Sequence, residues 1–73
     1  MSMQLSETAA GSKVKIARVD AGRGLTARLA AMGIIPGTNI TVAVNDRKGP
    51  IVVMVKDSKI ALGRGMVEKI LVQ

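Results

Sequence analysis

The sequence lacks the residue types on which most active sites and metal centres are built: it has no histidine, no cysteine and no aromatic residue in 73 positions. Without cysteine the chain forms neither a disulfide nor a thiolate metal site. Without histidine it lacks the commonest general base and metal ligand. Without aromatic rings it has no platform for stacking single-stranded bases and no aromatic-lined groove for proline-rich peptides.

The residues that remain do not suggest catalysis. The acids occur singly, at Glu7, Asp20, Asp46, Asp57 and Glu68. The three serines after Ser2 are in turn contexts, with lysine as the one available type of base, so a Ser–Lys pair stays open as an alternative. The methionines at 32, 54 and 66 stand in apolar contexts, where gap-filling in a core is expected rather than Cu(I) binding. We predict no enzyme activity, no cofactor and no metal ligands.

Long apolar runs are also absent. No stretch approaches the about 20 residues that a membrane-spanning helix needs. The N-terminus does not combine basic residues with a following apolar stretch, as a signal peptide does. We therefore expect a cytoplasmic protein.

What the chain has in excess is aliphatic side chains and positive charge. Hydrophobic residues make up 48% of it, and 11 lysines and arginines stand against 5 acids, for a net charge of +6. A chain of this length is one small domain, residues 1–73, with a thin core. The apolar excess predicts a surface that meets a partner, for which a second copy of the chain is one candidate. The charge suits nucleic acid, anionic lipid or an acidic protein.

The strongest local pattern lies in residues 23–38. Leu25, Leu29 and Met32 recur at i, i+4 and i+7, which predicts an amphipathic helix with these three side chains in the core. Gly33 is placed to end the helix in a left-handed conformation. Two isoleucines, 34 and 35, are expected to enter the core next.

Short strands are expected around this helix. Pro36 and Gly37 suit the central positions of a type II turn that starts the second strand. Gly63–Met66 is expected to form a 3₁₀ turn, and Leu5 is expected either to cover the barrel or to belong to a frayed end. The predicted fold is all-β with one short helix, a small five-stranded barrel with the helix between strands 1 and 2. The five strands are expected at 13–19, 38–45, 51–55, 59–62 and 68–72.

Two strands carry further expectations. In Lys13–Val19 the apolar alternation slips by one residue after Ala17, which indicates a bulge or the end of the strand. In the second strand, Ile40, Val42 and Val44 are expected to share the inner face.

The candidate binding surface is the outer face of the helix with the loop before it. The glycine-rich loop at 20–24 lacks the Lys-Ser/Thr pair of a phosphate-binding loop. Arginines beside an apolar stripe suit protein docking. The predicted partner-binding residues are Asp20, Arg23, Ala27, Arg28 and Ala31.

Two other uses of the basic residues remain open. A patch of Lys13, Lys15 and Arg18 with the helix arginines would bind phosphates, although we expect no nucleic acid in the absence of aromatic residues. Arg23, in its glycine-rich loop, would suit an arginine finger that acts on a GTPase.

Several segments together resemble the FeoA family, the small cytosolic component of the ferrous iron uptake system. They are Gln4–Glu7, Leu25–Leu29, Met32–Thr38, Ile60–Leu62 and Ile70–Val72. The resemblance spans about residues 3–73 and implies an SH3-like barrel with an inserted helix, similar to the C-terminal domain of iron-dependent repressors of the diphtheria toxin repressor type. It also implies a regulatory partner, the membrane permease FeoB with its cytosolic GTP-binding domain, and through it a peripheral position at the inner membrane. An iron-regulator-type or nucleic-acid-binding accessory barrel is the alternative.

Overall fold

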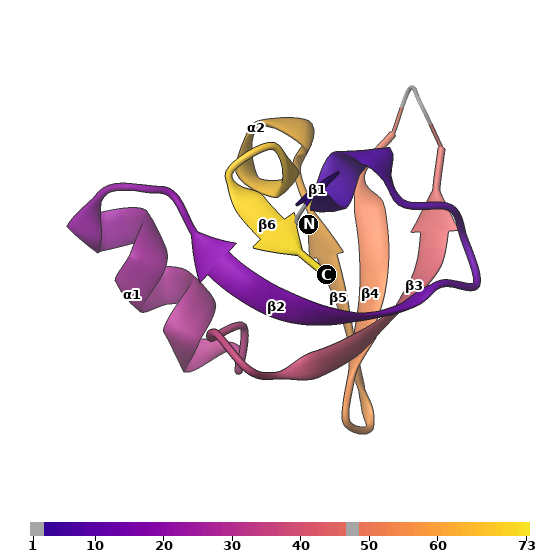
Figure 1. The fold of residues 1–73 in the computed structure, drawn as a ribbon, viewed down its shortest axis with the longest axis horizontal. Coiled ribbons are helices and arrows are strands. Elements are labelled where there is room, and N and C mark those ends of the chain that lie inside the picture. The colour runs from indigo at the N-terminus through magenta and orange to yellow at the C-terminus, as the bar shows by residue number, and fades with distance from the viewer. Residues whose placement is uncertain (1–2, 47–48) are drawn as a thin grey trace.

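The computed structural model describes residues 3–46 and 49–73 and shows a mostly β fold. One six-stranded antiparallel sheet has the order β1-β6-β2-β3-β4-β5 and curves into a small barrel, with α1 outside it (Figure 1). The strands are β1 (Met3–Gln4), β2 (Lys13–Val19), β3 (Asn39–Asn45), β4 (Ile51–Val55), β5 (Ser58–Leu62) and β6 (Ile70–Val72). The helices are η1 (Leu5–Glu7), α1 (Arg23–Ala31) and α2 (Arg64–Val67).

The predicted fold class is confirmed, but the strand count was one too low. The added strand is β1, in which Met3 and Gln4 pair with Val72 and Leu71 of β6. Two residues are too few to show a period-2 pattern, so the sequence holds no signal for this strand. The predicted helix therefore lies between β2 and β3.

The segment after β5 also differs from its prediction. Residues 64–67 form one α-helical turn, α2, where a 3₁₀ turn was expected. The carbonyl of Gly63 accepts hydrogen bonds from the amides of both Met66 (3.1 Å) and Val67 (3.2 Å). This one carbonyl therefore makes both the i→i+3 bond of a 3₁₀-helix and the i→i+4 bond of an α-helix. The last strand is shorter than predicted, because the amide of Lys69 turns back to the carbonyl of Met66.

A bulge in β2 confirms the slip predicted after Ala17. Ile16 pairs with Val72 and Arg18 pairs with Leu71, so Ala17 is the extra residue. Simple alternation would turn Arg18 inward, whereas the bulge keeps it exposed. Lys13 and Lys15 are exposed as well. As a result, the three cations of β2 share the outer face of the barrel.

A second bulge, in β3, overturns the expectation for Val44. Ile40 and Val42 are buried, but Val44 is 46% exposed. The register against β4 shifts between Val42, which pairs with Val53, and Val44, which pairs with Val52. The shift moves Val44 to the outer face, because one extra residue reverses the side-chain alternation.

The barrel interior is filled by aliphatic side chains. The buried hydrophobic residues are Leu5, Ile16, Leu29, Ile34, Ile40, Val42, Ile51, Val53, Val55, Leu62, Val67, Ile70 and Val72. Methionine contributes less than expected. Met66 packs against this core while half-buried, Met54 lies half-buried on β4, and Met32 is 37% exposed. The prediction that Met32 belongs to the core was therefore wrong.

Leu5 closes one end of the barrel, so the lid alternative is correct and the frayed-end alternative is not. Its side chain is fully buried. The hydroxyl of Thr8 donates to the Leu5 carbonyl at 2.7 Å. The Asn45 side-chain amide donates to the carbonyls of Ser6 (3.2 Å) and Thr8, which ties the end of β3 to the lid.

The helix ends where the glycine signal placed it. Gly33 has φ +86°, and the amide of Ile34 donates to the Leu29 carbonyl at 2.9 Å. Gly37 has φ +93°, and the amide of Thr38 donates to the Ile35 carbonyl at 3.1 Å, as in a type II turn. Ile34 is buried but Ile35 is 45% exposed, so only one of the two isoleucines enters the core.

The β4–β5 hairpin contains a lysine in a conformation that favours glycine. Its two central residues are Lys56 and Asp57, and Lys56 has φ +55°. A positive φ at the first central position is typical of a type II′ turn, which prefers glycine there.

Replacing this lysine should stabilise the protein. We expect Lys56→Gly to raise the free energy of unfolding by about 0.5–1 kcal/mol, because glycine adopts a positive φ without a steric cost. Denaturant unfolding measures the change. Asp57→Gly is the matched control and should give no gain, since Asp57 is not among the residues with positive φ. Equal effects of the two substitutions would contradict the turn assignment.

Candidate functional site

The loop before α1 is fixed to the barrel by its main chain. The amide of Asp20 donates to the Lys69 carbonyl at 2.7 Å. The Thr26 hydroxyl donates to the Ala21 carbonyl at 3.2 Å, and the Thr26 amide donates to the Gly22 carbonyl at 2.9 Å. These bonds set where α1 begins while leaving the Asp20 side chain exposed.

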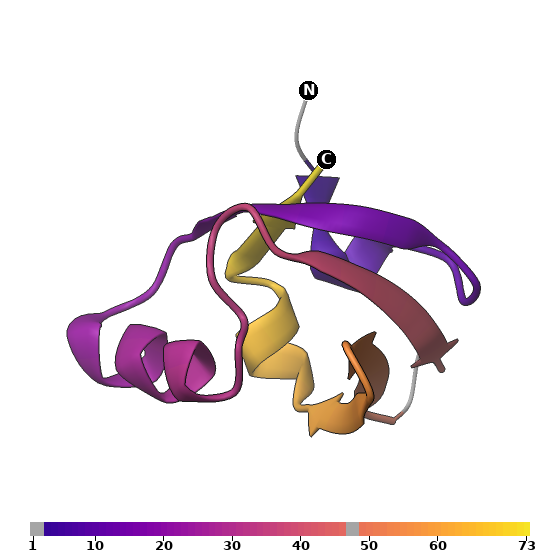
Figure 2. The same cartoon turned by 90° about the horizontal axis from the view of Figure 1, so that it is seen from below.

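The helix has one buried and one exposed side. Leu29 is fully buried and Leu25 is half-buried. Arg23, Ala27 and Ala31 follow one another at intervals of four residues, so they form a row on one face of the helix. All three are exposed. Figure 2 shows α1 on the opposite side of the barrel from the point where β3 ends.

The five predicted partner-binding residues are all exposed, but they are not equally grouped. Arg23, Ala27 and Ala31 share one row. Arg28 lies next to that row, toward the buried side, and Asp20 lies in the loop before the helix. We call these five residues the α1 face.

Two residues that were expected in the core, Met32 and Ile35, are exposed instead. Met32, one turn after Arg28, is 37% exposed, and Ile35 is 45% exposed. Both residues have the apolar spacing that is expected of core residues, so the sequence pattern did not distinguish them from buried residues. Met32 brings apolar area to the C-terminal end of the α1 face, one turn after Arg28.

The start of α1 is not built for helix stability. Gly22 is the N-cap and has no side chain to cap the free amides. Arg23 then places a positive charge at the positive end of the helix dipole, which costs about 0.3–1 kcal/mol. A local choice that disfavours the helix is typical of a residue retained for another purpose, such as binding.

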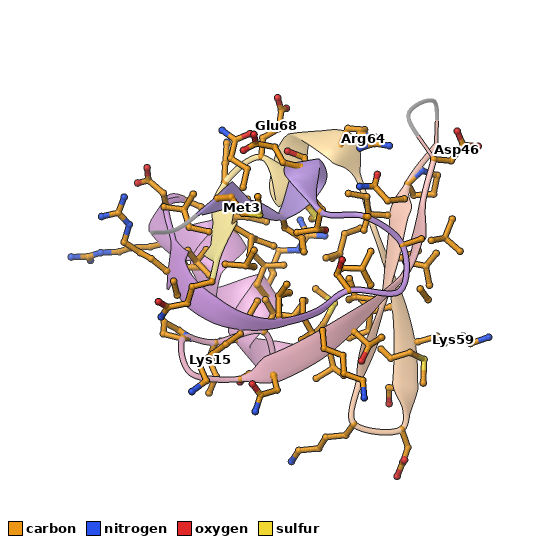
Figure 3. The ribbon with its side chains drawn as sticks, turned by 45° about the vertical axis from the view of Figure 1, so that its right-hand side comes forward. Met3, Lys15, Asp46, Lys59, Arg64 and Glu68 are labelled. Atoms are coloured by element: carbon orange, nitrogen blue, oxygen red, sulfur yellow. The ribbon has the colours of Figure 1, made fainter. Side chains whose placement is uncertain are left out.

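Arg64, in contrast, has a structural role. Its Nε donates to the Gly49 carbonyl at 3.0 Å, and its Nη2 donates to the Asp46 carbonyl. Figure 3 shows Arg64 and Asp46 at the same end of the molecule. These bonds join α2 to the two ends of the β3–β4 connection. Arg47 and Lys48, between the strands predicted at 38–45 and 51–55, lie outside the described residues.

The described residues show no metal cluster, pocket or membrane-spanning helix. Across 3–46 and 49–73, no three acidic, histidine or cysteine side chains come together as a metal site. The same residues enclose no pocket. Nor does any helix within them have the length and apolar character to cross a membrane.

Comparison with known proteins identifies the family. The family model described as "FeoA domain" matches residues 3–73. A protein of Methanocaldococcus jannaschii named "Putative Fe(2+) transport protein A" is 40% identical over 63 residues, which cover 86% of this chain and 76% of that protein.

Solved structures share the fold. The crystal structure of an iron uptake regulatory protein, FeoA, superposes with a TM-score of 0.88 at 30% identity, covering 100% of this chain and 96% of that one. The T. acidophilum protein IdeR superposes with a TM-score of 0.88 at 22% identity, which shows a shared fold alone, over 99% of this chain and 33% of that one. The SH3-like barrel and the family resemblance predicted from the sequence are thereby confirmed, and the chain belongs to the FeoA domain family.

Proposed function

We propose that this chain is a non-catalytic accessory protein of ferrous iron uptake that binds and regulates a FeoB-type GTPase permease. Family membership and the iron transport name of its relative support the role in iron uptake. The partner site is the cytosolic GTP-binding domain of the permease, which places the chain at the cytoplasmic side of the inner membrane.

The α1 face is the observation that carries the proposal. It presents two exposed arginines and small alanines that allow close approach, and the partly exposed Met32 lies beside it. Arginine beside apolar area is a frequent combination at the centre of protein interfaces. A positively charged face also favours encounter with an acidic partner surface.

Charge reversal at Arg28 tests this assignment. We expect Arg28→Glu to weaken binding to the isolated GTP-binding domain by about tenfold, because a favourable charge contact becomes a repulsive one. Isothermal titration calorimetry measures the affinity. Lys13→Glu is the matched control, since it makes the same charge change on β2, and it should bind as the parent does. Equal affinities of the parent and Arg28→Glu would overturn the role of this face.

The same mixtures report on regulation. We expect the rate of GTP hydrolysis by the permease domain to change when the chain is added, and the change to disappear with Arg28→Glu. Arg23→Ala distinguishes an arginine finger from simple docking, because a finger variant loses the effect on the rate while it keeps its affinity. If the chain binds the permease domain but leaves its rate of GTP hydrolysis unchanged, the proposed regulation is wrong and a role in assembly is left.

A further inference from the structure

The outer edge of β5 is unpaired. In the sheet order β1-β6-β2-β3-β4-β5, the described residues place β4 on one side of β5 and no strand on the other. In an antiparallel pair with a two-residue turn, alternate residues direct their main-chain groups toward the partner strand. Ser58, Ile60 and Leu62 face β4 in this way, so the N–H and C=O groups of Lys59 and Ala61 point away from the sheet. Both residues are exposed.

An apolar row leads up to this edge on the outer face of the barrel. Val44 pairs with Val52, and Val52 pairs with Ala61, so the three side chains lie next to one another across β3, β4 and β5. Val44 is 46% exposed, Val52 is half-buried and Ala61 is exposed. Met54 extends the apolar area along β4. Ile60, between Lys59 and Ala61, lies on the opposite face, where it is half-buried and packs against the core.

The charge near the edge of β5 determines which kind of added strand would bind there most favourably. Lys59 lies on the outer face beside Met54, and Figure 3 shows its side chain extending away from the barrel. The hairpin adds Lys56 against one acid, Asp57, and all three are exposed. Lysine on an edge strand discourages pairing with a second copy, which would bring its own lysines to the contact. An acidic strand meets no such repulsion and gains cross-strand charge pairs.

We propose that the free edge of β5 binds an extended segment of a partner protein in which apolar and acidic side chains alternate. The segment pairs as an added strand through the outward groups of Lys59 and Ala61. Its acidic side chains lie on the outer face, beside Lys59, and its apolar side chains lie on the opposite face, beside Ile60. This surface is separate from the α1 face, and the inference does not depend on the proposed function.

A peptide binding experiment tests the charge preference. The probe is an end-capped eight-residue peptide that alternates valine and glutamate, titrated into the isotope-labelled full chain at neutral pH. We expect the NMR amide signals of Lys59 and Ala61 to shift and to become protected from hydrogen exchange, because these amides gain acceptors. Lys59→Glu should weaken binding by about five- to tenfold. A valine–lysine peptide should bind the parent more weakly than it binds Lys59→Glu.

A proline at the edge tests the main-chain contact. Ala61→Pro removes one outward donor and no hydrogen bond to β4, a position where an edge strand tolerates proline. We expect this variant to melt close to the parent and to lose the peptide. Ala61→Val is the control, because it keeps the donor, and it should retain binding. Should Ala61→Pro keep its fold and bind normally, or should the signals of α1 shift instead, the proposal is wrong. If Ala61→Pro unfolds, Lys59→Glu and the two peptides decide between binding and no binding.

Discussion

Valine in place of Gly33 is expected to lower the free energy of unfolding by about 2–4 kcal/mol. Gly33 has φ +86°, a region that β-branched residues strongly avoid. A Cβ at this position would also lie 3.3 Å from Cγ1 of Val55, which is a core residue at 5% exposure. Crowding in a packed core adds its own cost. In a domain of this size the loss corresponds to a fall in Tm of about 10–25 °C.

Two other substitutions separate these contributions. Gly37 has a similar φ of +93°, but a Cβ there would meet no atom within 4 Å. Gly37→Val therefore carries the conformational cost without the contact with Val55, and we expect a smaller loss of stability. Gly33→Asn should cost less than Gly33→Val, because asparagine tolerates a left-handed backbone. Thermal unfolding measures all three, and a Gly33→Val variant that melts with the parent would refute the helix end described here.

Truncating Leu29 is the second change with a large expected effect. Leu29→Ala should lower the free energy of unfolding by about 2–5 kcal/mol, since the side chain is fully buried and its loss leaves a cavity. Among the described residues of α1, Leu29 is the one buried position. We therefore also expect faster amide hydrogen exchange throughout α1 than in β3 or β4.

A neighbouring apolar residue is the control for this prediction. Met32 directly follows α1, and it is 37% exposed. Met32→Ala should change the free energy of unfolding by less than about 1 kcal/mol, because a surface side chain loses little contact. Denaturant unfolding compares the two variants. Equal losses would mean that Leu29 does not anchor the helix.

The sequence predicted features that depend on local chemistry. Glycine and proline signals located the end of α1 and the turn after it, since these conformations depend on φ at single residues. Alternation located β2 and β3 and even the bulge at Ala17. Exposure of the four α1-face residues within the helix followed from the helical period. Whether those residues bind a partner is still a prediction.

The features that were missed depend on distant parts of the chain. Val44, Met32 and Ile35 have the spacing of core residues, yet a bulge or the edge of the barrel leaves them exposed. The two-residue strand β1 forms because β6 lies beside it and pairs with it. Arg64 has two main-chain acceptors near residue 49 that no local pattern reveals. Such features follow from which elements become neighbours, and periodicity carries no information about that.

The position of β6 has a consequence for how the protein folds during synthesis. β3, β4 and β5 follow one another directly, so each pairs with a neighbour made moments earlier. β6 lies between β1 and β2 in the sheet, yet Ile70 follows Val19 by about fifty residues. At about 5–20 residues per second, roughly 3–10 s pass on the ribosome before β6 reaches β1 and β2. Until then β1 and the β6-facing edge of β2 have no strand to pair with, so the barrel closes only after its last strand has been made.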